Sequence, residues 1–228
     1  MMARLFSVFF SGLVIFFAVL MVNNLLNGKP SDKAIAVGYF AAIFYTLIFG
    51  VILCRFLREA LSLINPNLSF VVLTFAGSVF LEIIIWAAQN FFQASGAAIS
   101  SNLVADLIMT VPFYTLLSYL FARFLLSYRL SWQMVVVAGG FYEVAADGVI
   151  GNLVRLNLAG ALISPLLLPL FVITYAPIIL VPFLVISPLI NPVLDLKGKS
   201  WLVLAKPLWA VLIFPFSLGL GLLVEKIF

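Results

Sequence analysis

The chain has 228 residues, of which 65% are hydrophobic and 9% are charged, against about 45–50% and about 25% in soluble domains. A water-soluble fold cannot cover its surface with so little charge, so the composition excludes a soluble protein and predicts an integral α-helical membrane protein. The net charge of +4 comes from basic residues scattered near the ends of apolar runs. That distribution is typical of membrane orientation signals and argues against a nucleic-acid partner.

Long apolar segments follow one another along the whole chain. In order they are Leu5–Leu26, Ala34–Leu57, Leu68–Gln93, Leu103–Ser127, Trp132–Leu156, Leu158–Ile190 and Trp201–Ile227. Each has the roughly 20 residues that a helix needs to cross a bilayer, and the stretches between them are too short for a soluble domain. We therefore predict an all-α, polytopic transmembrane helical bundle of about seven spans. It forms a single membrane-embedded domain over residues 1–228.

The sixth segment is predicted to be broken rather than straight. It is longer than one span needs and contains Pro165, Pro169, Pro177, Pro182 and Pro188. Proline removes a backbone donor and clashes with the preceding helical turn. The segment is therefore expected to form a kinked helix, two half-helices or two short spans. Interrupted helices of this kind often line the binding sites of transporters, although neighbouring helices can also absorb the kinks.

The distribution of lysine and arginine predicts a cytoplasmic N-terminus. With that orientation the inner side carries eight of the 12 basic residues, namely Arg4, Arg55, Arg58, Arg123, Arg129, Lys197, Lys199 and Lys206. The outer side carries the other four, which are Lys29, Lys33, Arg155 and Lys226. An odd number of spans then places the C-terminus outside.

Polar side chains inside the apolar segments are the candidates for function. A charge at the bilayer centre costs at least ~2.5–3.5 kcal/mol, so such residues face the bundle interior or water. In the third segment Glu82 lies near the middle, and Gln89 and Asn90 follow on the same helical face. This polar stripe is expected to face other helices.

A second polar series lies in the fourth segment. Polar residues recur there at every fourth position, as Asn102, Asp106, Thr110, Tyr114 and Ser118. Asp106 falls in the first helical turn, where the helix dipole favours an acid for purely structural reasons. We therefore keep two interpretations of Asp106, a binding residue and a residue that stabilises the start of the helix.

The fifth segment carries Glu143 near its centre and Asp147 one turn later, with Tyr142 beside them. Arg155 lies further along the same drifting face and is expected to anchor at the outer membrane interface. Several glycines surround the two acids. They favour either close packing of helices or space for a ligand.

Glu82 and Glu143 are the acids nearest the membrane centre by their position along the segments. If the two carboxyl groups meet, the pair is expected to hold at least one proton near neutral pH, because adjacent buried negative charges repel each other. Such a pair is typical of a proton-coupled site. A single protonated glutamate that hydrogen-bonds a neighbouring helix would be purely structural.

The chain contains no histidine and a single cysteine, Cys54. This excludes histidine-based haem, metal and triad chemistry, as well as an internal disulfide. No glycine-rich phosphate loop and no serine nucleophile motif is present. The sequence therefore indicates no histidine- or cysteine-based metal site and leaves any cofactor unknown, although buried carboxylates could serve as ligands for Mg²⁺.

Three functions fit these residues. The first is a small multi-pass permease, proton-coupled through its acids, whose cavity is lined by the third to sixth segments and takes a small-molecule or lipid substrate. Its candidate substrate- or proton-binding residues are Glu82, Asp106, Glu143, Asp147, Gln89, Asn90, Tyr142 and Arg155. The second is a membrane-embedded enzyme that uses the carboxylates on a lipid or isoprenoid substrate. The third is a non-catalytic subunit that assembles with a membrane protein partner.

Overall fold

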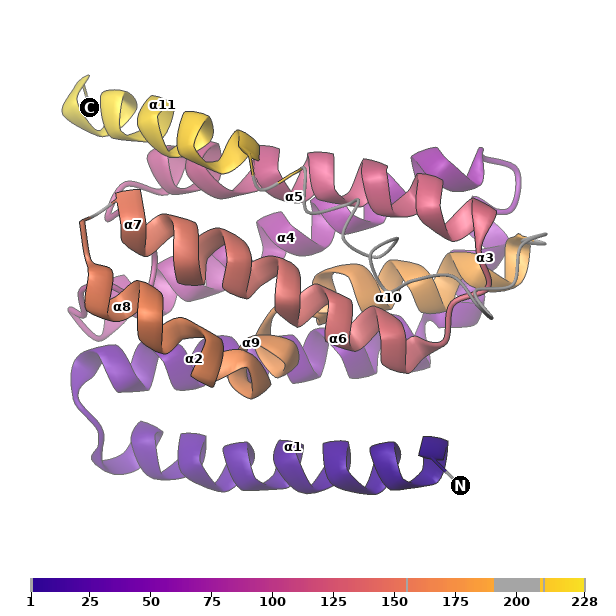
Figure 1. Ribbon diagram of the computed structural model, residues 1–228, viewed down its shortest axis with the longest axis horizontal. Coiled ribbons are helices and arrows are strands. Elements are labelled where there is room, and N and C mark those ends of the chain that lie inside the picture. Colours follow the sequence, from indigo (N-terminus) through magenta and orange to yellow (C-terminus); the bar gives the residue numbers. More distant parts are fainter. Residues whose placement is uncertain (1, 155, 191–209, 211, 228) are drawn as a thin grey trace.

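The computed structural model confirms the all-α membrane bundle. It describes residues 2–154, 156–190, 210 and 212–227, and it describes the backbone alone at residues 2–7, 126, 147, 154 and 214. Every regular element in this part of the chain is a helix. Figure 1 shows the long helices side by side along the long axis of the molecule, as expected of helices that cross a membrane.

Five helical stretches among the described residues are long and apolar enough to be membrane spans, and they match the first five predicted segments. They are Val8–Asn27, Pro30–Ile52, Pro66–Phe91, Leu103–Leu125 and Trp132–Gly151. Residues 201–209 and 211, in the first part of the seventh predicted segment, fall outside the described residues. Its described helix is α11 (Phe214–Ile227).

The first two spans form a hairpin of α1 (Met2–Asn27) and α2 (Pro30–Tyr45). The backbone N–H of Lys29 donates to Asp32 Oδ2 at 3.1 Å, which helps to fix the start of α2. The second predicted segment is less regular than its apolar pattern suggested. It continues from α2 into a π-helical stretch, η1 (Thr46–Ile52), and then into α3 (Cys54–Leu61).

The next three helices begin at polar residues that cap their first turns. They are α4 (Pro66–Phe91), α5 (Leu103–Ser127) and α6 (Trp132–Glu143). The side chains of Asn65, Asn102 and Ser131 accept hydrogen bonds from backbone N–H groups of these first turns. Beyond Glu143 the fifth span changes to a π-helix, η2 (Val144–Gly151), followed by the short α7 (Asn152–Val154).

The sixth segment is broken, as its prolines predict. It consists of α8 (Leu158–Ile163), η3 (Ser164–Leu167), α9 (Leu168–Thr174), α10 (Pro177–Ile186) and η4 (Ser187–Leu189). The chain bends by 42° between the part that ends at Thr174 and the part that begins at Pro177. In Figure 1, α8 and α9 lie toward one end of the bundle and α10 continues toward the other. The predicted break is therefore confirmed, and the number of times the segment crosses the membrane stays a prediction.

The two ends of the chain lie at opposite ends of the bundle. Figure 1 shows α1 starting at the end opposite to the one at which α11 finishes. This is the arrangement expected for an odd number of crossings. The cytoplasmic placement of the N-terminus stays a prediction.

The glycines of the fifth span allow the helices around it to approach closely. A Cβ atom added at Gly139 would lie 2.9 Å from Ala176 Cα, and one added at Gly140 would overlap the side chain of Val172. Because real Cβ atoms do not approach other atoms so closely, these positions bring α6 against α9 and the start of α10. The structure thus supports the packing interpretation of these two glycines.

Candidate functional site

Glu82 of α4 and Glu143 of α6 line the same small cavity, here called the acid cavity. Both side chains are buried, with exposed fractions of 6% and 4%. The cavity has a volume of about 20 Å³, which is enough for about one water molecule. The two acids that sequence position placed near the membrane centre therefore lie at one site.

Helix α5 supplies hydroxyl groups to the acid cavity through Thr110 and Tyr114, which lie one helical turn apart. The Tyr114 hydroxyl donates to Glu143 Oε2 at 3.1 Å. The Thr110 hydroxyl donates to the backbone carbonyl of Asp106 at 3.0 Å. These bonds hold the wall of the cavity in a defined geometry around Glu143.

The fifth span changes its helical form directly after Glu143, which is the last residue of α6 and precedes the π-helical η2. A π-helical turn inserts an extra residue per turn, so it rotates the side chains that follow it. Such turns are frequent at functional sites. The change therefore sets the rotation of the residues after Glu143 relative to Glu143 itself.

The loop between α4 and α5, residues 92–102, folds back so that Ala97 and Ile99 line the acid cavity. Irregular backbone inside a membrane bundle must find hydrogen-bond partners within the protein. The buried side chain of Gln89 supplies two of them. Its Oε1 accepts from the N–H groups of Ala97 at 2.9 Å and Ala98 at 2.8 Å.

Asp106, which is fully buried in α5, holds the next part of the same loop. Its Oδ1 accepts from the N–H groups of Ile99 at 2.8 Å and Ser100 at 3.1 Å. The Ser100 hydroxyl donates to Glu225 Oε1 of α11 at 2.8 Å. The loop is thus fastened to α4, α5 and α11, and it forms one wall of the acid cavity.

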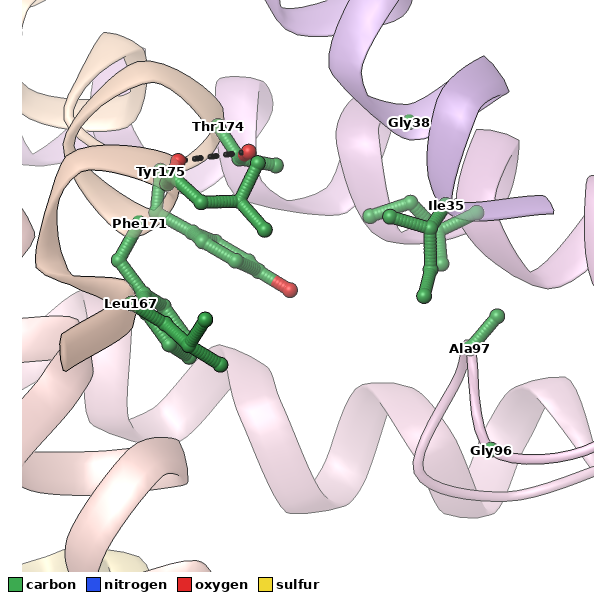
Figure 2. Close-up of a pocket in the computed structure, with 10 residues that line it drawn as sticks. Ile35, Gly38, Gly96, Ala97, Leu167, Phe171, Thr174 and Tyr175 are labelled. Atoms are coloured by element: carbon green, nitrogen blue, oxygen red, sulfur yellow. Dashed lines mark hydrogen bonds between the residues drawn. The ribbon is translucent and has the colours of Figure 1, made fainter. Parts of the chain in front are cut away.

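A larger cavity, here called the outer pocket, adjoins the acid cavity and has a volume of about 210 Å³ (Figure 2). Its walls are mostly apolar. Ile35 comes from α2, Ile85 from α4, and Leu170 and Phe171 from α9. The pocket is thus suited to an apolar group.

The outer pocket and the acid cavity share two lining residues, Ala97 and Tyr175. Tyr175 lies in the break between α9 and α10, where the bend exposes its ring to both cavities. The ring stacks on that of Phe171 with centroids 5.8 Å apart. Figure 2 shows the Tyr175 hydroxyl directed toward the middle of the outer pocket. The break therefore lies at the boundary between the two cavities.

Two other residues selected from the sequence lie away from these cavities. Asn90 is exposed, and its Nδ2 donates to the backbone carbonyl of Trp86 at 2.9 Å. Tyr142 is buried in the apolar core, where its ring lies 6.2 Å from that of Phe121. Because consecutive residues of a helix point in different directions, Tyr142 lies on a different face of α6 from its neighbour Glu143.

The side chain of Asp147 and the whole of Arg155 lie outside the described residues. Three hydroxyl-bearing residues join the site without having been selected for it, namely Thr110, Tyr114 and Tyr175. The spacing of four residues in the fourth segment was a usable signal for the first two. Tyr175 lies two residues before Pro177 in a largely apolar segment, which is a weaker signal.

Comparison of the chain with protein-family models, with curated proteins and with solved structures found no match. The polar residues that line the water-sized cavity are Glu82, Glu143, Thr110, Tyr114 and Tyr175, and an apolar pocket lies beside it.

Proposed function

We propose that this protein is a small multi-pass membrane permease whose transport is coupled to proton binding at Glu82 and Glu143. The observation that carries the proposal is that two buried glutamates, Glu82 and Glu143, line one cavity. Two adjacent negative charges in a medium of low polarity repel each other, so such a pair retains a proton near neutral pH. Binding or movement of a substrate at the cavity changes that repulsion, and the proton occupancy changes with it.

The broken sixth segment supports this proposal. Discontinuous helices at a central site let one part of a transporter move against another while the site stays in place. Here the break between α9 and α10 contributes Tyr175 to both cavities. A change in the 42° bend would therefore alter the boundary between the outer pocket and the acid cavity.

Infrared difference spectroscopy of the purified protein in lipid nanodiscs tests proton binding. The spectrum recorded in acidic buffer minus that in alkaline buffer contains the carbonyl band of each carboxyl group that takes up a proton. We expect a band that is lost in Glu143→Gln and weakened in Glu82→Gln. Glu59→Gln, which changes an exposed acid of α3, serves as the matched control and should leave the band in place.

Transport itself is tested in liposomes that contain the protein and a trapped pH-sensitive dye. Small amines, alcohols and carboxylic acids are added one at a time. A coupled substrate changes the internal pH with the wild-type protein and the Glu59→Gln control, but not with Glu143→Gln. Undiminished proton movement in Glu143→Gln would refute the proposed coupling.

The apolar character of the outer pocket favours a second candidate function, a membrane-embedded enzyme that acts on a lipid or isoprenoid. In that case Tyr175 and the two glutamates would transfer protons to and from a substrate whose apolar part occupies the pocket. Incubation of the purified protein with a membrane lipid extract, followed by mass spectrometry, separates the two functions. New products that depend on Glu143 would support the enzyme.

A further inference from the structure

The outer pocket and the acid cavity are complementary to two different parts of one molecule. The outer pocket has a volume of about 210 Å³ and largely apolar walls, whereas the acid cavity has about 20 Å³ and contains two carboxyl groups. They meet at Ala97 and Tyr175. We infer that together they bind a small amphiphilic amine in its protonated form, with the apolar body in the outer pocket and the ammonium group in the acid cavity.

The charge of the site selects a cation. Among the described residues, the charged side chains that line the two cavities are Glu82 and Glu143, and no lysine or arginine lines either of them. A carboxylate or phosphate ligand would place a further negative charge beside these acids, at a high cost in a medium of low polarity. An ammonium ion instead gains charge-assisted hydrogen bonds.

The size of the acid cavity selects a primary ammonium group. Such a group is compact and carries three N–H donors, and it is similar in size to the single water molecule for which the cavity has room. Glu82 and Glu143, which line this cavity, supply carboxyl oxygens as acceptors for these donors.

The outer pocket limits the size of the apolar body. A cavity of about 150 Å³ accommodates one benzene ring, so a volume of about 210 Å³ fits one ring with a short chain. The ring of Phe171, stacked on Tyr175, offers an aromatic face to the ligand. The ligand class that fits this volume is therefore a small aryl- or alkylamine.

Binding of this cation displaces a proton. This step depends on the proposed function, in which the carboxyl pair holds one proton. The ammonium ion forms an ion pair with the carboxylate, and the proton of the carboxyl group leaves to the solvent. The charge of the site is unchanged because one positive charge enters as another leaves. Transport by this route is an exchange of one amine for one proton.

The test uses 2-phenylethylamine, with 2-phenylethanol and 3-phenylpropanoate as neutral and anionic counterparts of similar shape. Binding to the full-length protein in detergent is measured by calorimetry in two buffers that differ in ionisation enthalpy, which gives the number of protons released. At neutral pH we expect the amine to bind and to release up to one proton. Glu143→Gln should weaken binding by about tenfold or more, the loss of one charge-assisted hydrogen bond. Glu59→Gln should bind like the wild type.

A second pair of variants tests the outer pocket without changing an acid. Leu170→Phe reduces the space in the pocket and should weaken amine binding, whereas Leu166→Phe, at a position 78% exposed, should not. Equal binding of the amine and the alcohol without proton release would overturn the inference, as would equal affinity of Leu170→Phe and the wild type. If the infrared bands of the two glutamates titrate but the amine does not bind, the inference fails while the proposed function stands. If those bands do not titrate, the proposed function fails whatever the amine does.

Discussion

Replacing Asp106 by alanine would remove the acceptor that holds the central part of the loop between α4 and α5. Asp106 is fully buried, and its Oδ1 accepts from the N–H groups of Ile99 at 2.8 Å and Ser100 at 3.1 Å. A buried N–H group left without a partner costs about 1–3 kcal/mol. Loss of the buried Ser100 bond is therefore expected to destabilise the closed loop by about 1–3 kcal/mol, and loss of the partly buried Ile99 bond by less.

Hydrogen exchange measured by mass spectrometry on peptides that contain residues 97–100 reports this change. A loss of about 3 kcal/mol, at 1.4 kcal/mol for each factor of ten, raises the population of the open loop about 100-fold, and exchange accelerates by the same factor. Asp106→Asn keeps an acceptor oxygen but loses the charge, which roughly halves the strength of the bonds. Its acceleration should be about tenfold.

Asp32→Ala is the matched control. Asp32 also accepts a backbone N–H, that of Lys29, but at an exposed site at the start of α2. This variant should fray the first turn of α2 and leave the exchange of residues 97–100 unchanged. If Asp106→Ala exchanged in the loop at the wild-type rate, the loop would be held by other groups and the structural role given to Asp106 would be refuted.

Two further pairs of variants compare a tightly packed position with an open one, and thermal unfolding in detergent measures both. Gly140→Ala places a methyl group into Val172 and should cost about 1–3 kcal/mol, whereas Gly219→Ala, with nothing within 4 Å, should be neutral or stabilising. Equal melting temperatures would show that α6 can move away from α9 at little cost. Arg58→Gln removes two bonds of 3.3 Å to the last carbonyl groups of α10 and should cost about 1–2 kcal/mol. Arg55→Gln, which changes an exposed arginine, is the control and should cost less than about 0.5 kcal/mol. If it destabilised the protein as much as Arg58→Gln, the cause would be the loss of a positive charge and not the loss of these two hydrogen bonds.

The membrane class, the helical fold and the approximate ends of the first five spans follow from the amino-acid sequence. These features depend on local interactions, so a short stretch of chain contains all the information. The fourth segment was predicted over Leu103–Ser127, and α5 has those bounds, because Asn102 caps one end and the apolar pattern ceases at the other. The prolines of the sixth segment likewise predicted its break.

The grouping of the site residues was decided by the tertiary structure alone. Periodicity placed Glu82, Gln89 and Asn90 on one face of a helix, yet they have three different environments. Glu82 lines the acid cavity, Gln89 holds the loop, and Asn90 is exposed. The neighbours of each residue depend on its depth along the helix. The helical periodicity of the sequence gives the face on which a residue lies but not which other element packs there.

Asp106 shows the same division between local and tertiary information. The sequence allowed two roles for it, an acid in the first helical turn or a binding residue, and in the structure its Oδ1 accepts from a loop that precedes the helix. Glu82 and Glu143, far apart in the chain, come together only because α4, α5 and α6 pack around one space. The sequence identifies the side chains whose exposure to lipid would be unfavourable, because the free-energy cost of that exposure depends on each residue separately. The tertiary structure decided which of them meet, because that depends on the rotation and depth at which the helices pack.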